Sequence, residues 1–223
     1  MPQFQALTNQ GTLAMPAAKR RAKRQSRRPS RRFAPRVPIL TEEQMNAPQR
    51  ALMEAMRSGP RGQTLTVRGP FAAWLHAPVF GDLAQRLGAH CRYKTTVPPR
   101  LSEFAILCTA RLWRAQFEWF AHAPMAEKAG VLPRTISDLK AGRVPSKAPK
   151  DERAIYDFIQ ELYRTKRVSD RTYARVHAFL TNEGMIELAG ILGYYTLISF
   201  TLNVFQMMPP DDAELAFAEP KFP

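Results

Sequence analysis

Apolar residues recur at intervals of three and four positions along most of the chain, and this spacing predicts a series of α-helices. The clearest stripe lies at i, i+3, i+4, i+7 and i+11: Leu101, Phe104, Ala105, Cys108 and Leu112. No stretch alternates between apolar and polar residues for more than a few positions, so we expect no β-sheet. The pattern predicts an all-α fold.

Proline, glycine and capping signals divide this pattern into separate helices. The first begins at a capping box in Thr41–Gln44, and residues 59–70 form a loop. A helix late in the chain is capped by Ser169 or Asp170 and has Tyr173, Val176 and Leu180 on its inner face. The other predicted ranges are 71–75, 80–93, 99–112, 115–129, 133–140, 151–166 and 188–208.

The predicted helix over 188–208 is 21 residues without a formal charge, long enough to cross a bilayer. Its polar side chains, which include Thr196, Ser199 and Asn203, would meet hydrocarbon on several sides. A helix that is apolar on all faces is typical of a protein core. We therefore expect a soluble protein without a membrane span.

Positive charge is concentrated near the start of the chain. The formal net charge is +14, and ten basic residues lie between Lys19 and Arg36, ahead of the first acidic residue, Glu42. Without these ten, 23 basic and 19 acidic residues leave a net charge of +4. The composition predicts a disordered basic extension over 1–36 and one helical domain over 37–223.

Four roles are open for the basic extension: a solvated tail without a partner, a nucleic-acid arm, an anionic-lipid arm, or an organelle transit peptide. The solvated tail is the interpretation that the composition favours. The chain contains two cysteines, Cys91 and Cys108, without a CxxC motif or a disulfide framework. A reducing compartment, the cytoplasm, fits this use of cysteine.

One pair of residues suggests acid–base chemistry. Glu118 and His122 are four positions apart, so a helix would place the carboxylate and the imidazole on one face. Phe117, Trp119 and Phe120 would exclude water around them. Such a pair can hold one imidazole tautomer and shuttle a proton; the alternative is a solvated surface pair.

Several short strings resemble the carboxymuconolactone decarboxylase and alkylhydroperoxidase D (AhpD) superfamily. They are Glu103, Arg111-Leu112-Trp113, Phe117-Glu118-Trp119 with His122, Leu75-His76-Ala77-Pro78, 167–173, Gly193-Tyr194-Tyr195 and 202–205. The resemblance spans about 39–208. Within the superfamily, this sequence resembles an uncharacterised branch that lacks the CxxC motif. It implies an AhpD-like helical bundle that assembles as a trimer or a dimer of trimers.

In the peroxidase members of this superfamily, a glutamate, two cysteines and a histidine form a proton relay. The resemblance places the glutamate at Glu103, the histidine at His122 and the two thiols at Ala115 and Glu118, so both thiols are missing. A straight helix would separate Glu103 from Glu118 by about 22 Å. The resemblance therefore implies a break near 112–116, which no glycine or proline marks.

The resemblance, together with these residues, implies a decarboxylase-like enzyme that acts on a small organic acid, lactone or carbonyl compound without a cofactor. Glu118, His122 and Glu103 are the catalytic candidates. Arg111 and Arg114 are candidates for holding a substrate carboxylate, with Trp119 beside them. The alternatives are a non-catalytic or divergent AhpD-like protein and a Glu–His metal site; the latter has too few ligands, so we expect no metal.

Overall fold

The computed structural model describes residues 33–220, and within this range the chain contains helices, turns and loops but no β-strand. The all-α prediction is confirmed. The helices are α1 (Ala47–Arg57), α2 (Pro70–Trp74), α3 (Pro78–Tyr93), α4 (Pro99–Trp113), α5 (Gln116–Lys128), α6 (Pro133–Lys140), α7 (Lys150–Thr165), α8 (Asp170–His177) and α9 (Asn182–Val204).

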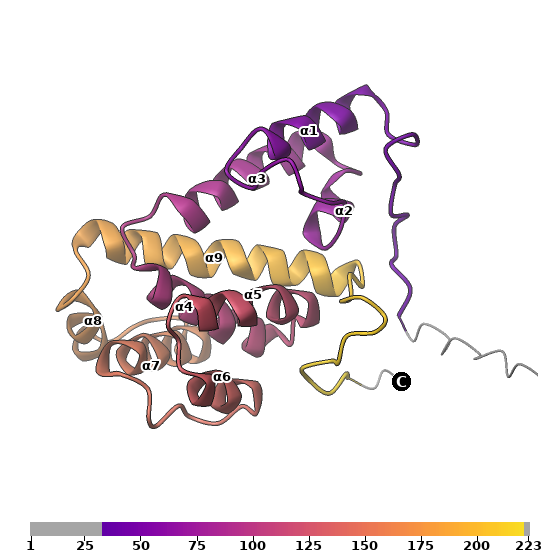
Figure 1. Ribbon diagram of the computed structural model, residues 1–223. Coiled ribbons are helices and arrows are strands. Elements are labelled where there is room, and N and C mark those ends of the chain that lie inside the picture. The colour runs from indigo at the N-terminus through magenta and orange to yellow at the C-terminus, as the bar shows by residue number, and fades with distance from the viewer. Residues whose placement is uncertain (1–32, 221–223) are drawn as a thin grey trace, which may run out of the picture. The chain divides into compact units, whose positions relative to one another are not determined.

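Helix α9 lies at the centre of the helical domain formed by residues 33–220. Helices α1, α2 and α3 lie on one side of it, and α4 to α8 lie on the other (Figure 1). Its main partner is α4, and it also contacts α2, α3, α5 and α8. The most apolar part of α9 is 56% buried, which fits the core helix expected from its all-round apolar sequence although its length would suffice for a membrane span.

Helix α9 begins six residues before the predicted start at position 188 and ends before position 208. Thr181 is its N-cap, and its hydroxyl accepts a hydrogen bond from Gly184 N at 3.1 Å. At the other end, Gln206 has a φ of 53° and turns the chain away from the helix. Capping chemistry sets these ends more sharply than the apolar run does.

The predicted capping box at Thr41 is wrong. Helix α1 begins at Ala47, and its capping box pairs Asn46 with Gln49 through reciprocal bonds of 2.9 and 3.0 Å. Thr41 to Gln44 forms an isolated turn, in which the Gln44 side chain accepts from Thr41 N. Asn46 has the better local arrangement because Pro48 pre-sets the first turn that follows it.

Two of the predicted inward positions are exposed. Tyr173 is 43% exposed and stacks on His177, because the inner face of α8 runs through Thr172 and Val176. Leu112 is 38% exposed because it borders a cavity at the end of α4. Leu180 is buried as predicted, but it follows α8.

The predicted basic extension covers residues 1–36, of which residues 1–32 lie outside the described residues. Its last four residues are described, and Arg36 is bound to the end of α9: its backbone N donates to Phe205 O at 3.0 Å and its Nη1 to Val204 O at 2.9 Å. These contacts attach the segment that enters the domain to the central helix.

The predicted break between residues 112 and 116 is present. Helix α4 ends at Trp113, Arg114 adopts the left-handed conformation with φ 49°, and α5 starts at Gln116. Ala115 N donates to Ala110 O at 2.9 Å, and the Asn203 side chain donates to Trp113 O at 2.7 Å. The turn therefore satisfies helix-end carbonyls without the glycine that usually occupies such a position.

Close packing of α3 against α9 predicts how glycine substitutions at this contact affect the free energy of unfolding. A Cβ at Gly88 would lie 1.9 Å from the Tyr194 hydroxyl oxygen, whereas a Cβ at Gly190 meets nothing within 4 Å. We expect Gly88→Ala to lower the free energy of unfolding by about 2 kcal/mol through overpacking. Gly190→Ala should leave it unchanged or raise it by up to about 1 kcal/mol through helix propensity. Urea denaturation measures both; equal effects would contradict the packing argument.

Candidate active site

A buried glutamate holds the candidate histidine. Glu103 comes from α4 and His122 from α5, and the reversal at Arg114 brings these side chains together. His122 Nδ1 lies 2.8 Å from Glu103 Oε2, and both residues are buried. A carboxylate at this distance accepts the proton of Nδ1, which fixes the tautomer and leaves Nε2 to act on a bound molecule.

Glu118 lies one turn before His122 on α5 and is 1% exposed. Its Oε2 accepts a hydrogen bond from Ser199 Oγ at 2.7 Å, whereas Oε1 is buried without a partner among the described residues. Burial raises the pKa of Glu118 well above 4.5, and the charge of Glu103 raises it further against the opposing bond from Ser199. Burial therefore favours the protonated form of Glu118, and it rules out the solvated pair considered as the alternative.

Glu118 and His122 line the same cavity, which has a volume of about 100 Å³. Helices α2, α3, α5 and α9 form its walls together with the loop before α2. Most of the lining is apolar or aromatic, a composition that excludes water around the acid and the imidazole. The other lining residues are Arg61, Pro70, Phe71, Gly88, Arg92, Phe117, Ala121, Met125, Tyr194, Tyr195, Ile198 and Leu202.

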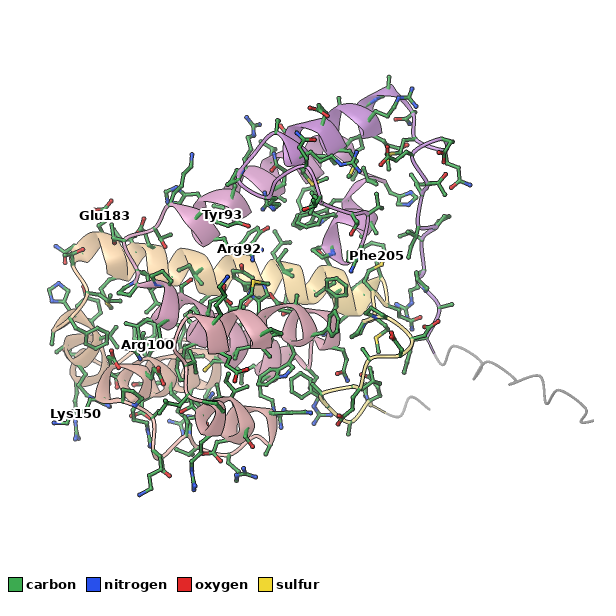
Figure 2. All side chains as sticks on the ribbon, in the orientation of Figure 1. Arg92, Tyr93, Arg100, Lys150, Glu183 and Phe205 are labelled. Carbon is green, nitrogen blue, oxygen red and sulfur yellow. The ribbon has the colours of Figure 1, made fainter. Side chains whose placement is uncertain are left out.

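Two half-buried arginines give this cavity a positive charge. Arg61 donates to Gln85 Oε1 at 3.1 Å and to Gln85 O at 3.0 Å. Arg92 extends from the last turn of α3 (Figure 2) and donates to Met125 Sδ. Neither guanidinium pairs with a carboxylate of the described chain, so both charges are available to an anion in the cavity.

Two neighbouring tyrosines complete the polar lining. The Tyr195 ring meets the His122 ring edge-on, with centroids 5.1 Å apart. Burial raises the pKa of Tyr194 and of Tyr195 above their ordinary value, so each hydroxyl keeps its proton. They can donate hydrogen bonds to oxygens of a bound molecule.

The other predicted site residues lie elsewhere. Arg111 and Arg114 line a second cavity between α4, α6 and α7. Trp119 is buried against Phe217, with ring centroids 5.2 Å apart, and Glu103 reaches the first cavity only through His122. The structure thus brings Glu103, Glu118 and His122 together but not the two predicted arginines.

Sequence reasoning missed Arg61, Arg92, Ser199 and Tyr195 as site residues. The Gly193-Tyr194-Tyr195 string carried part of the resemblance and could have indicated the tyrosines. No local pattern marks Arg61, which lies in a loop between turn residues, or Arg92, one of several charged residues on α3. Their position depends on how α3 and α9 pack.

Residues 33–220 contain no group of three or more His, Cys, Asp or Glu side chains placed to hold a metal ion. Ala115 and Glu118, the positions at which the sequence resemblance predicts the two missing thiols, are both buried. The two cysteines present, Cys91 and Cys108, are also buried, and burial raises the pKa of each thiol.

Comparison with solved structures supports the fold. The chain is similar to the alkylhydroperoxidase AhpD core of an uncharacterized peroxidase-related protein from Ralstonia eutropha JMP134, with a TM-score of 0.66 and 15% identity. The match covers 80% of this chain and 93% of that one. No protein-family model and no curated protein matches the chain. The protein therefore has an AhpD-like helical fold, and the predicted resemblance is confirmed at the level of fold.

The raised pKa of Glu118 predicts a pH-dependent stability. Above pH 4.5 the unfolded chain releases this proton while the folded protein retains it, so the free energy of unfolding falls as pH rises towards the folded-state pKa. Glu118→Gln removes this loss. We expect the variant to gain stability relative to the native protein by up to about 1.4 kcal/mol per pH unit above pH 5.

Urea denaturation between pH 5 and pH 8 measures this gain. Glu127→Gln removes an exposed carboxyl group from the same helix and serves as the control. A gain with the same pH dependence in both variants would contradict the assignment of the effect to the buried acid.

Proposed function

We propose that the protein is an enzyme with carboxymuconolactone decarboxylase-like acid–base chemistry, acting on a small organic acid, lactone or related carbonyl compound. One observation carries the proposal: the Glu103–His122 bond of 2.8 Å orients an imidazole at a cavity that Glu118, a buried acid with a raised pKa, also lines. A proton acceptor and a proton donor that line one cavity are what proton transfer to and from carbon requires.

The proposed roles follow from the residues that line the cavity and from the Glu103–His122 bond. His122 Nε2 removes or returns a proton, while Glu103 holds the ring and stabilises the imidazolium that forms. Glu118 donates its proton to a developing oxyanion or carbanion. Arg61 and Arg92 hold a substrate carboxylate, the role expected earlier of Arg111 and Arg114.

For a carboxylated lactone, the proposed reaction is loss of carbon dioxide. The bond between the ring carbon and the carboxylate breaks, its electron pair enters the conjugated system as a dienolate, and carbon dioxide leaves. Glu118 or His122 then delivers a proton to carbon, and solvent restores the enzyme's proton. The electron pair of the broken bond ends in the new C–H bond, so the step needs no redox partner.

Peroxide reduction is not part of the proposal. It requires a thiolate that attacks peroxide and a second thiol that resolves the sulfenic acid. Cys91 and Cys108 are buried, with thiol pKa values raised by burial, and neither belongs to a CxxC motif. The word "peroxidase-related" describes the Ralstonia protein and does not carry over to this chain.

Variants of the buried pair test the proposed chemistry. With carboxymuconolactone as the probe and carbon dioxide release as the measurement, we expect His122→Asn to lower kcat by about 10²- to 10⁴-fold, because the proton acceptor is lost. His90→Asn is the matched control, since His90 is an exposed histidine on α3. A folded His122→Asn variant with full turnover would contradict the assignment; a native protein inactive on this and related lactones and keto acids would favour the non-catalytic alternative.

The arginine pair makes a separate kinetic prediction. We expect Arg92→Gln to raise KM for the carboxylated probe by about 10-fold or more, since a charge-assisted hydrogen bond contributes about 1.5–3 kcal/mol. Arg86→Gln removes an exposed arginine from the same helix. It should change KM by less than about 2-fold, because an exposed surface charge contributes little. Equal KM values in the two variants would indicate that residues other than Arg92 bind the carboxylate of the probe.

A further inference from the structure

A second cavity, of about 250 Å³, lies at the junction of α4, α6 and α7. Three arginines line it, and no Asp or Glu is among its described lining residues. The full lining is Cys108, Arg111, Leu112, Arg114, Leu139, Gly142, Arg143, Tyr156 and Gln160. It shares no residue with the cavity of Glu118 and His122.

Arg111 is the innermost of the three arginines. Its Nε is buried and forms no hydrogen bond within the described chain, and its guanidinium lies 5.2 Å from the centroid of the Phe217 ring. A Cβ at Gly142 would lie 2.4 Å from Arg111 Nη2, and Gly142 has a φ of +71°. The glycine therefore lets the guanidinium lie directly against the backbone after α6.

The other two arginines stand at the rim. Arg114 occupies the left-handed position between α4 and α5, and its exposed side chain has no hydrogen-bond or ion-pair partner in residues 33–220. Arg143 donates to Asp138 Oδ1 through Nε at 3.0 Å and Nη2 at 2.8 Å. One of three positive charges is thus compensated by a neighbour, and two are not.

Capping of helix ends does not account for this cluster. Helices α4 and α6 both end here, and arginines near a helix C-terminus often donate to the last carbonyls. Yet the side chains of Arg111 and Arg114 donate to no carbonyl of the described chain, and Arg143 binds a carboxylate instead. Their donors remain available to a bound molecule.

Helix α7 adds two uncharged polar residues to the lining, Tyr156 with its hydroxyl and Gln160 with its amide. Burial raises the pKa of Tyr156, so the hydroxyl retains its proton and can donate. The wall therefore presents hydrogen-bond donors to an anion without adding a repelling negative charge.

We propose that this cavity is a binding site for a small multivalent anion, one that carries a phosphate group or two carboxylates. Arg111 and Arg114 bind the anionic oxygens, and Arg143, oriented by Asp138, adds charge at the rim. The planar fork of arginine matches both phosphate and carboxylate, which defines the shared chemistry. Because the two cavities share no residue, this proposal stands apart from the acid–base function.

Isothermal titration calorimetry of the full chain tests the proposal, with pyrophosphate and malonate as probes and sodium chloride holding ionic strength constant. We expect saturable binding of at least one probe. Arg114→Gln and Arg111→Gln should each weaken it by about 10-fold or more, the loss of one charge-assisted contact. Arg134→Gln, which removes an exposed arginine of α6 outside the cavity, should weaken it by less than about 2-fold, the effect of a surface charge.

Binding of pyrophosphate alone would assign the site to phosphate groups, and binding of malonate alone would assign it to dicarboxylates. The absence of saturable binding, or an equal loss in Arg134→Gln, would overturn the proposal. A loss in Arg92→Gln with none in Arg114→Gln would place the anion in the acid–base cavity and would also overturn it. Arg114 is exposed, so its variant keeps the test valid where Arg111→Gln disturbs folding.

Discussion

The reversal of the chain at Arg114 is the constraint on which the candidate site depends. In one continuous helix, Glu103 and His122 would lie about 28 Å apart along the axis. A single residue with a φ of 49° folds α5 back beside α4 and reduces this separation to a hydrogen bond of 2.8 Å. A non-glycine residue in this conformation costs on the order of 1 kcal/mol, which the packing of α4 and α5 against α9 offsets.

Burial then sets the protonation states around this bond. Glu118 is 1% exposed with one oxygen unpartnered, and the cost of an isolated buried charge raises its pKa and favours its protonated form. Arg61 and Arg92 are half-buried and donate to Gln85 and Met125. One cavity thus combines an acid with a raised pKa, an oriented imidazole and two guanidinium groups, and the described chain contains no metal ligand set.

Periodicity predicted most of the helices because their apolar positions face one core, as Phe104, Ala105 and Cys108 do on α4. The ends were predicted less well, since Thr41 and Asn46 are competing caps and the proline in the turn after Asn46 decides between them. The catalytic candidates were found from spacing and resemblance. The two cavity arginines were not, because their positions depend on how α3, the loop before α2 and α9 meet in space.

The contact between Gly88 and Tyr194 sets one wall of the candidate cavity. Because position 88 has no side chain, the Tyr194 hydroxyl rests directly on the backbone of α3, and both residues line the cavity of Glu118 and His122. A methyl group at position 88 would lie 1.9 Å from the hydroxyl oxygen, so the tyrosine would have to move. The missing methyl group therefore fixes where this ring stands beside the acid and the imidazole.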